Sequence, residues 1–208
     1  MKVKICGLTN IDDALLAQRH GAHHLGFILC ESPRQISVPD LKSLLAGLPA
    51  VASTIGVFKD SPLQNLLATC REAPLRGVQL HGAESADYVN ELGAARPDLF
   101  ILKAIRVEGE KCLQDPEDFL HADGLVFDSA VSHFQATERA PLSRSLKGVV
   151  KDQVAIFLAG GVSAGNVKSL IELHAPDGLD LSSSLESAVG LKDHSLVLNF
   201  FETLKRIV

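Results

Sequence analysis

Residues 1–9 read MKVKICGLT, and this stretch contains the unit from which the rest of the chain is built. An apolar-rich run ends at Cys6 and is stopped by Gly7, after which Thr9 or Asn10 offers a helix N-cap. Cys6 therefore lies at the C-terminal end of a predicted strand and faces a loop. A thiol there can act as a base or nucleophile if its surroundings favour the thiolate. A lone cysteine is more often a small buried apolar residue, so its role depends on the rest of the chain.

The same strand–loop–helix unit recurs along the sequence. Eight short runs are nearly continuous in apolar residues, which is typical of parallel strands covered by helices. These runs are residues 3–6, 24–29, 51–58, 77–80, 100–105, 125–127, 154–158 and 178–181. Helix-like segments separate them, at residues 10–20, 40–48, 63–71, 84–92, 108–120, 142–150, 163–174 and 192–207. The pattern of the segment 142–150 is poor.

Eight alternations of strand and helix in 208 residues predict an α/β fold, a single-domain (β/α)8 TIM barrel that spans residues 1–208. A doubly wound open sheet is the alternative. No Gly-x-Gly-x-x-Gly follows the first predicted strand, and this absence disfavours the open sheet. No linker, low-complexity segment or change in composition marks a second domain.

The composition limits the classes of function. Apolar residues make up 46% of the chain and charged residues 22%, which is typical of a globular protein. The formal net charge of −5 argues against binding to nucleic acid, which usually needs a basic face. It leaves open a small anionic substrate held by backbone N–H groups.

The cysteines and the N-terminus indicate the compartment. Four cysteines lie far apart in the sequence, so neither a zinc site nor a disulfide framework is predicted. We find no signal peptide and no apolar run of membrane-spanning length. These features predict a protein of the reducing cytoplasm that binds no metal.

In a barrel of this type, reactive groups lie at the C-terminal ends of the strands and in the loops that follow. Asp128 ends the sixth predicted strand and can serve as a general acid, or simply as a turn or N-cap residue. Arg34, after the second strand, can hold a carboxylate through two hydrogen bonds or lie solvated on the surface. His81 can line the site or be a satisfied core histidine. Gln79 and Arg106 are further polar residues at the ends of the fourth and fifth strands.

The last two predicted strands end in sequences suited to an anion. Gly160 and Gly161 follow the seventh strand, and Ser182 and Ser183 follow the eighth. Backbone N–H groups and hydroxyls in such loops frequently hold a phosphate in these barrels. Each motif alone fits a tight turn or a helix cap. Their occurrence on adjacent strands favours a phosphate site.

Motifs spread along the whole chain resemble the phosphoribosylanthranilate isomerase family. They occur in the family's order: Lys4-Ile5-Cys6-Gly7-Leu8-Thr9, Gly26-Phe27 with Ser32-Pro33-Arg34, Ile55-Gly56-Val57-Phe58, Val78-Gln79-Leu80-His81-Gly82, Leu158-Ala159-Gly160-Gly161, and Asp180-Leu181-Ser182-Ser183 followed by Glu186, Gly190, Lys192 and Asp193. The resemblance implies a (β/α)8 enzyme of tryptophan biosynthesis that uses no cofactor. Its reaction is the Amadori rearrangement of N-(5′-phosphoribosyl)anthranilate to a 1-deoxyribulose 5-phosphate.

The resemblance also implies a role for each candidate residue. Asp128 would be the general acid that opens the ribose ring, and Cys6 the general base that removes the C2 proton. Arg34 would hold the anthranilate carboxylate. The loops with Gly160, Gly161, Ser182 and Ser183 would hold the phosphate, and Gln79, His81 and Arg106 would contact other parts of the substrate.

Two segments depart from the family's pattern. Residues 129–139 contain no glycine where the family has a glycine-rich stretch, and a loop without glycine cannot bring its backbone as close to a ligand. We expect residues 129–141 to form a mobile lid whose closure differs from that of its relatives. The segment between Gly26 and Arg34 is one residue shorter than usual, which affects where Arg34 is placed.

Two other functions are compatible with these motifs. One is the isomerisation of a related sugar phosphate on the same scaffold. The other is a non-catalytic barrel that binds a phosphorylated metabolite or a partner protein, although a binding module needs neither Cys6 nor Asp128. We expect a small phosphorylated substrate and no nucleic-acid or membrane partner. We expect a monomer, with a homodimer as the alternative.

Overall fold

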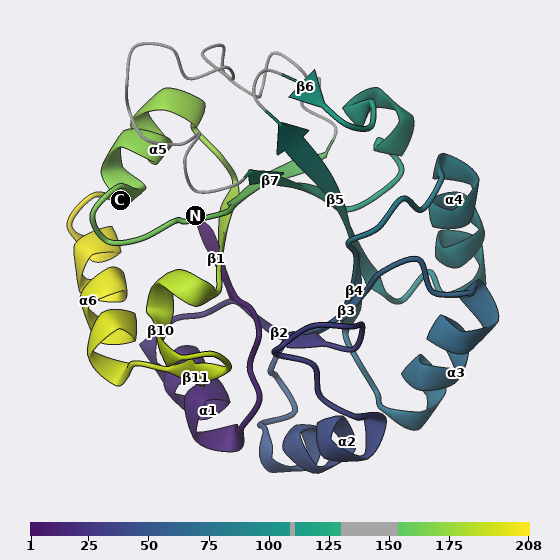
Figure 1. Cartoon of the computed structure of the whole chain (residues 1–208), viewed down its shortest axis with the longest axis horizontal. Coiled ribbons are helices and arrows are strands. Elements are labelled where there is room, and N and C mark those ends of the chain that lie inside the picture. The colour runs from purple at the N-terminus through teal and green to yellow at the C-terminus, as the bar shows by residue number, and fades with distance from the viewer. Residues whose placement is uncertain (109–110, 130–153) are drawn as a thin grey trace.

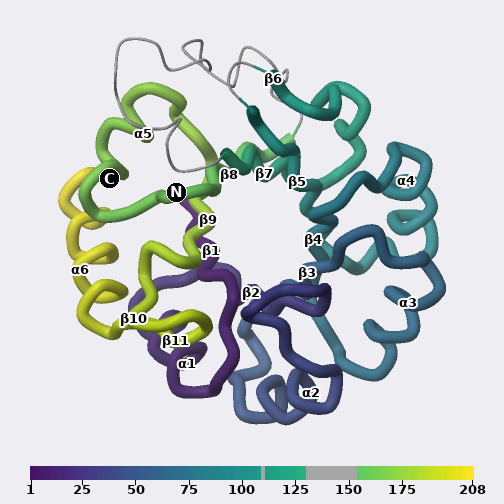
Figure 2. The backbone as a smooth tube through the Cα atoms, in the orientation of Figure 1, coloured from purple at the N-terminus to yellow at the C-terminus, as the bar shows by residue number. Residues whose placement is uncertain are grey.

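The computed structural model describes residues 1–108, 111–129 and 154–208, and within them eight parallel strands close into a barrel (Figure 1). Each strand pairs with the next along the chain, and the last returns to the first, as Figure 2 shows. This closure confirms the predicted (β/α)8 barrel and excludes the open sheet. The barrel strands are β1 (Lys2–Ile5), β2 (His24–Ile28), β3 (Thr54–Phe58), β4 (Gly77–Leu80), β5 (Phe100–Glu108), β7 (Gly124–Ser129), β8 (Ala155–Ala159) and β9 (Gly178–Leu181).

Helices surround the barrel and cover its outer face (Figure 1). Several begin at a polar side chain that caps the helix: the predicted cap Asn10 accepts a hydrogen bond from the Asp13 N–H, and Ser37 and Ser85 accept one from the N–H groups of Asp40 and Tyr88. Among the described residues the α-helices are α1 (Ile11–His20), α2 (Val38–Gly47), α3 (Leu63–Glu72), α4 (Ala86–Ala95), α5 (Val167–His174) and α6 (His194–Lys205). The predicted helix 142–150 and most of the predicted lid lie outside the described residues.

The helix predicted over residues 108–120 is wrong. Strand β5 continues to Glu108, the short strand β6 (Lys111–Cys112) pairs with it in antiparallel fashion, and a 3-10 helix η1 (Pro116–Phe119) follows. Pro116 explains the error, because proline lacks the N–H that a helix interior needs but fits the start of a helix.

Most other boundaries differ from the prediction by a few residues, and the segments near residues 51 and 183 show two further differences. The strand predicted from residue 51 begins at Thr54, and Val51 is 88% exposed. After β9, a 3-10 helix η4 (Ser183–Leu185) leads into a hairpin of β10 (Glu186–Ala188) and β11 (Leu191–Lys192), which was not predicted.

Strand β1 shows how the sequence divides between the two faces of the barrel wall. Val3 and Ile5 join the main hydrophobic core beneath the helices. Because successive side chains in a strand point to opposite faces, Lys2, Lys4 and Cys6 point into the barrel. A second hydrophobic cluster contains no helix residue and fills the interior near β5, β7 and β8; its members are Leu102, Ala104, Val126, Phe157 and Ala159.

The N-terminal ends of the strands are closed by packing and by hydrogen bonds. The His24 ring stacks on Phe100 with ring centroids 5.2 Å apart. The Asp123 carboxylate accepts a hydrogen bond from the Ile101 N–H at 2.7 Å, and Asp177 accepts one from the Ile156 N–H at 2.9 Å. In the described part of the chain, none of the helices has both the length and the apolar character needed to cross a membrane.

Candidate active site

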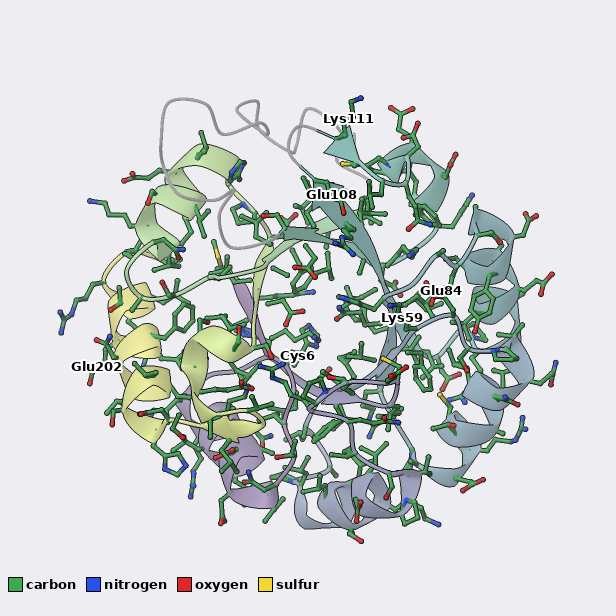
Figure 3. The ribbon with its side chains drawn as sticks, in the orientation of Figure 1. Cys6, Lys59, Glu84, Glu108, Lys111 and Glu202 are labelled. Atoms are coloured by element: carbon green, nitrogen blue, oxygen red, sulfur yellow. The ribbon has the colours of Figure 1, made fainter. Side chains whose placement is uncertain are left out.

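Two adjoining hollows lie at the C-terminal ends of the strands, and both are lined by Lys59, His81 and Asp128. The first, of about 380 Å³, contains most of the predicted site residues: Cys6, Arg34, Gln79, His81, Asp128, Gly160, Gly161, Ser182 and Ser183. The second, of about 540 Å³, contains Arg106. The fold therefore brings all ten predicted site residues around one opening. In Figure 3, Cys6 and Lys59 both lie toward the middle of the barrel.

Cys6 comes directly after β1, and its backbone N–H donates to the Leu181 carbonyl at 2.7 Å. This bond fixes the end of β1 beside the end of β9. The residue is only 7% exposed. Burial raises the pKa of the Cys6 thiol, and the positive charge of Lys4 opposes that rise. The thiol thus faces the cavity from a largely dry position.

Asp128 lies near the end of β7, across the opening from Cys6, and its side chain is 35% exposed. One carboxylate oxygen is 3.4 Å from His81 Nε2. The other ring nitrogen of His81 lies 3.2 Å from the Gln79 side-chain amide. Gln79 and His81 therefore orient the face that Asp128 presents to the cavity. Solvent and a ligand can both reach this carboxyl group, as a general acid requires.

The loop after β8 can form only with glycine. Gly160 has φ +90°, and a Cβ there would overlap the Ser129 carbonyl oxygen and lie 3.0 Å from Asp128 Oδ1. Gly161 also has a positive φ, and its carbonyl accepts a hydrogen bond from the Asn166 side chain at 2.9 Å. The backbone at Gly160 therefore approaches the end of β7 more closely than a side chain would allow.

The loop after β9 meets the glycine loop at the rim of the cavity. The Ser184 hydroxyl donates a short hydrogen bond to the Val162 carbonyl and ties the two loops together. Ser182 and Ser183 lie at the start of the 3-10 helix η4, facing the same hollow as Gly160 and Gly161. The arrangement has the form of an anion site that is built from the two loops.

Arg34 lines the cavity, but its side chain is held by an acid. Its Nε and Nη2 atoms donate to the two Glu186 carboxylate oxygens at 2.8 and 2.7 Å. The Lys192 ammonium donates to the same carboxylate at 2.9 Å. In the described part of the chain, two of the five N–H donors of Arg34 are used, both by Glu186. The shortened segment before Arg34 still lets it reach the cavity, at a position set by Glu186.

Several charged residues of the site were not assigned a role from the sequence. Asp180 lines the cavity from β9, and Lys4 pairs with it from β1. Lys59 lines both hollows from the end of β3. Lys4 could have been found from the alternation of Lys2, Lys4 and Cys6 along β1. Nothing in the sequence indicates that Glu186 pairs with Arg34.

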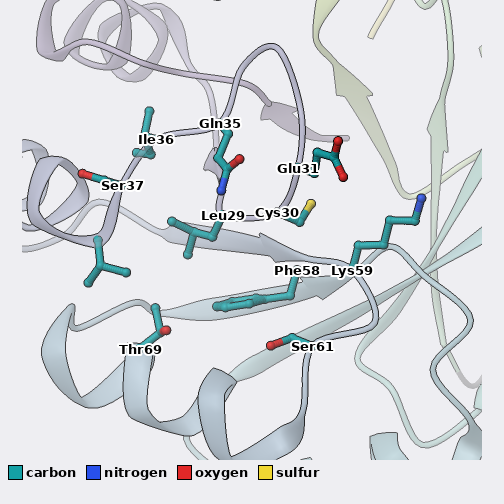
Figure 4. Close-up of a pocket in the computed structure, with 11 residues that line it drawn as sticks. Leu29, Cys30, Glu31, Gln35, Ile36, Ser37, Phe58, Lys59, Ser61 and Thr69 are labelled. Atoms are coloured by element: carbon teal, nitrogen blue, oxygen red, sulfur yellow. The ribbon is translucent and has the colours of Figure 1, made fainter.

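A further pocket lies outside the opening. This pocket, of about 360 Å³, lies between the segment after β2 and the helix α3, and Lys59 points away from Leu29 and Thr69 within it (Figure 4).

Within the described ranges, no group of three or more His, Cys, Asp or Glu side chains is placed to hold a metal ion. All four cysteines are free thiols.

Comparisons with known proteins agree with this geometry. The family model described as "N-(5'phosphoribosyl)anthranilate (PRA) isomerase" matches residues 3–203. The N-(5′-phosphoribosyl)anthranilate isomerase of Pelobacter propionicus is 35% identical over 206 residues, which cover 99% of this chain and 96% of the relative. The crystal structure of phosphoribosyl anthranilate isomerase from Thermus thermophilus has 29% identity, full coverage of both chains (100%) and a TM-score of 0.83.

A second similar structure carries a ligand. It is a phosphoribosyl anthranilate isomerase in complex with reduced 1-(o-carboxyphenylamino)-1-deoxyribulose 5-phosphate, with 29% identity, 99% coverage of both chains and a TM-score of 0.82. The match of the family model over nearly the whole chain shows that this protein belongs to the N-(5′-phosphoribosyl)anthranilate isomerase family.

Proposed function

We propose that this chain converts N-(5′-phosphoribosyl)anthranilate to 1-(o-carboxyphenylamino)-1-deoxyribulose 5-phosphate, with Asp128 as the general acid and Cys6 as the general base. The observation that supports these roles is that the two side chains line one cavity, together with two loops suited to a phosphate. The reaction is an isomerisation, so the substrate and the product contain the same atoms. It therefore needs no external oxidant or reductant.

The acid acts first. Asp128 donates a proton to the ribose ring oxygen, and the bond between this oxygen and C1 breaks. The nitrogen lone pair of the anthranilate forms a double bond to C1, which gives an open-chain iminium. The partly exposed position of Asp128 allows its proton to be replaced from solvent after each turnover.

The base acts on the open-chain form. The Cys6 thiolate removes the C2 proton, and the electron pair of that C–H bond forms the C1–C2 double bond of an enolamine while the iminium nitrogen becomes neutral. The enolamine then gains a proton at C1 and loses the C2 hydroxyl proton, which leaves the ketone. A buried thiol is suited to this step because the thiolate, once formed, is poorly solvated and strongly basic.

Binding is assigned to the residues around this pair. The phosphate lies between Gly160–Gly161 and Ser182–Ser183, and the carboxylate of the anthranilate lies against Arg34. Glu186 holds Arg34 in two hydrogen bonds, and this prevents its guanidinium from leaving the cavity wall. Gln79 and His81 orient Asp128 and contact the ribose, and Arg106 contacts the substrate from the second hollow.

The proposal also covers the domain organisation, the oligomeric state and the compartment of the protein. We propose that residues 1–208 act as one barrel domain, as a monomer in the cytoplasm. Among the described residues, the exposed large apolar side chains include Val189 and Leu191 in the β10–β11 hairpin and Leu196 and Leu198 on α6, whereas Val51 before β3 lies apart from them. Light scattering of the purified protein distinguishes the monomer from a homodimer.

The test is a coupled assay in which phosphoribosylanthranilate is generated freshly and its fluorescence is followed. The wild-type chain should remove the fluorescence, and Cys6→Ala and Asp128→Asn should not. Cys70→Ala is the matched control, because Cys70 is also a buried cysteine but lies on α3, away from the cavity. Equal activity in all three variants would remove Cys6 and Asp128 from the mechanism.

A crystal structure with the reduced product analogue tests the phosphate site. The phosphate should accept hydrogen bonds from the backbone N–H groups of the loops after β8 and β9. A phosphate bound only at Arg139 or Arg144 would contradict the assignment, and both of these residues lie outside the described ranges.

A further inference from the structure

A fully buried lysine lies beneath Cys6 inside the barrel. Lys4 has 0% exposure, and its ammonium donates to both Asp180 carboxylate oxygens at 3.0 and 2.9 Å. Lys4 and Asp180 are register partners on the adjacent strands β1 and β9. Their pairing therefore follows from the sheet register, with both side chains pointing into the barrel.

The Lys4 ammonium and the Cys6 sulfur border the same small space. A Cβ added at Gly26 would lie 2.9 Å from Cys6 Sγ and 3.0 Å from Lys4 Nζ. Gly26 is on β2, which pairs with β1 on the side opposite to β9. The missing side chain lets the thiol and the ammonium approach each other.

The charges around Cys6 act in opposite directions. Burial raises the pKa of the thiol, whereas Lys4 lowers it both through its charge and through a hydrogen bond. Asp180 and Cys6 together keep the pKa of Lys4 above its ordinary value despite burial, so the ammonium remains charged. The other charged or titratable groups that act on Cys6 come from neighbouring elements, namely Asp180, Lys192, Arg34 and Cys30.

We infer that Lys4 is a positioning residue that holds the Cys6 thiol at the floor of the cavity and stabilises its thiolate, with Asp180 fixing the ammonium in place. The inference rests on the proposed function, because it concerns the group to which that function assigns proton abstraction. It adds to that function the residue that makes a buried thiol usable as a base. Lys4 does not touch the substrate in this arrangement, since it lies below Cys6.

The same barrel contains a matched pair without a thiol. Lys103 on β5 is also 0% exposed, and its ammonium lies 3.2 Å from a Glu84 carboxylate oxygen that is itself buried. Lys103 donates in addition to the carbonyls of Gly82 and Ala104. This pair braces the loop after β4, so its loss serves as a control for the ionisation of Cys6 when a buried ion pair is removed elsewhere in the barrel.

The experiment uses three variants. The first is Lys4→Met, and the second combines Lys4→Met with Asp180→Asn. The third, the control, combines Lys103→Met with Glu84→Gln. The double variant removes both charges, so it remains available if Lys4→Met alone does not fold. The thiolate of Cys6 is titrated by its ultraviolet absorbance in chains that carry Cys30→Ser, Cys70→Ala and Cys112→Ser. The pH profile of kcat/KM is measured in chains that retain these three cysteines.

In both Lys4 variants the ionisation of Cys6 should move to higher pH, by about one unit or more in Lys4→Met. The value of kcat/KM at neutral pH should fall about tenfold or more, and this deficit relative to the wild type should shrink at alkaline pH. The double variant should show a smaller shift, because Asp180 opposes Lys4. The control should lose stability but keep the wild-type ionisation and pH profile.

An unchanged ionisation of Cys6 in folded Lys4 variants overturns the inference, as does an equal shift in the Lys103 control. If the ionisation of Cys6 shifts but the pH profile of kcat/KM does not, Lys4 controls the pKa of the Cys6 thiol, but Cys6 is not the base of the reaction. The failure of the inference and the failure of the proposed function therefore give different results.

Discussion

The two ends of the barrel use polar side chains in opposite ways. At the C-terminal end, Cys6, His81 and Asp128 face a cavity, and His81 and Asp128 are 39% and 35% exposed. At the N-terminal end, the barrel itself supplies partners for strand N–H groups, as in the hydrogen bonds from the Ile101 and Ile156 N–H groups to Asp123 and Asp177.

The open end of the barrel thus serves catalysis, and the closed end serves the stability of the fold. The interior side chains of β1 show it in a single strand: Lys2 lies over the Phe100 ring at the closed end, Lys4 is buried in the middle, and Cys6 reaches the cavity. A change at the open end should therefore alter turnover and leave the free energy of unfolding nearly unchanged. A change at the closed end should do the reverse.

The largest effect is expected for Cys6→Ala at the open end. Removal of a positioned base lowers kcat by about 10²- to 10⁴-fold, and steady-state kinetics measure this loss. In the wild type, the Cys6 thiol should ionise only in the alkaline range, because burial raises its pKa, and its ultraviolet absorbance measures this. Urea unfolding should give nearly the same free energy for both proteins. A near-normal kcat in Cys6→Ala would show that another group removes the C2 proton.

Asp128→Asn should have the next largest effect on turnover, about 10²-fold or more, because an amide cannot deliver the proton to the ring oxygen. Its size and polarity match those of the aspartate, so the variant should still bind the reduced product analogue. Calorimetry measures that binding. Loss of analogue binding together with loss of turnover would make Asp128 a structural residue and would favour the non-catalytic barrel.

His24 at the closed end should control stability at acid pH. Burial, together with the positive charges of Lys2, Lys4 and His23, lowers its pKa to about 4 from 6.5. In the described part of the chain, its Nε2 atom has no hydrogen-bond partner, so a charged ring would bury an N–H without an acceptor. Its contribution is therefore complete above pH 6.5 and is lost as the pH falls toward 4, by about 3 kcal/mol.

The variant His24→Gln should remove most of this pH dependence and leave kcat unchanged. The exposed His121 supplies the control His121→Gln, which should keep the wild-type dependence. Urea unfolding at several pH values measures both. A variant His24→Gln that loses stability with acid as steeply as the wild type would assign the dependence to other groups.

Much of the fold could be predicted because parallel strands buried on both faces appear as apolar runs. The segment 108–120 could not be predicted by apolar spacing alone, since Val107 and Phe119 are buried by a strand and a 3-10 helix instead of by one helix. The hairpin of β10 and β11 depends on a turn at Gly190, which has φ +79°. A short hairpin that packs on a barrel leaves too little alternation in the sequence to be recognised.

The site could be predicted where a residue's place on its strand determines its role. Cys6 and Asp128 end apolar runs, so the barrel rule places both at the opening. Lys4 and Asp180 stand inside such runs, and their pairing depends on the register between β1 and β9. The partner of Arg34 is Glu186, 152 residues away, on a hairpin that was not predicted. Contacts of that kind arise only from the closed fold.

The smallest expected effect is at the two Asp-Gly-Leu sequences of the closed end, residues 123–125 and 177–179. Each aspartate exchanges two hydrogen bonds with a residue of the preceding barrel strand: Asp177 with Ile156, and Asp123 with Ile101. Asp177→Ala should lower the free energy of unfolding by about 1 kcal/mol, because a strand N–H loses its acceptor while the side chain itself lies near solvent. Asp123→Ala should behave alike, and kcat and KM should stay at the wild-type values in both. Urea unfolding and the fluorescence assay measure the two properties on the same preparations. A fall in kcat in either variant would show that the ends of the barrel are coupled, and the division between them would no longer hold.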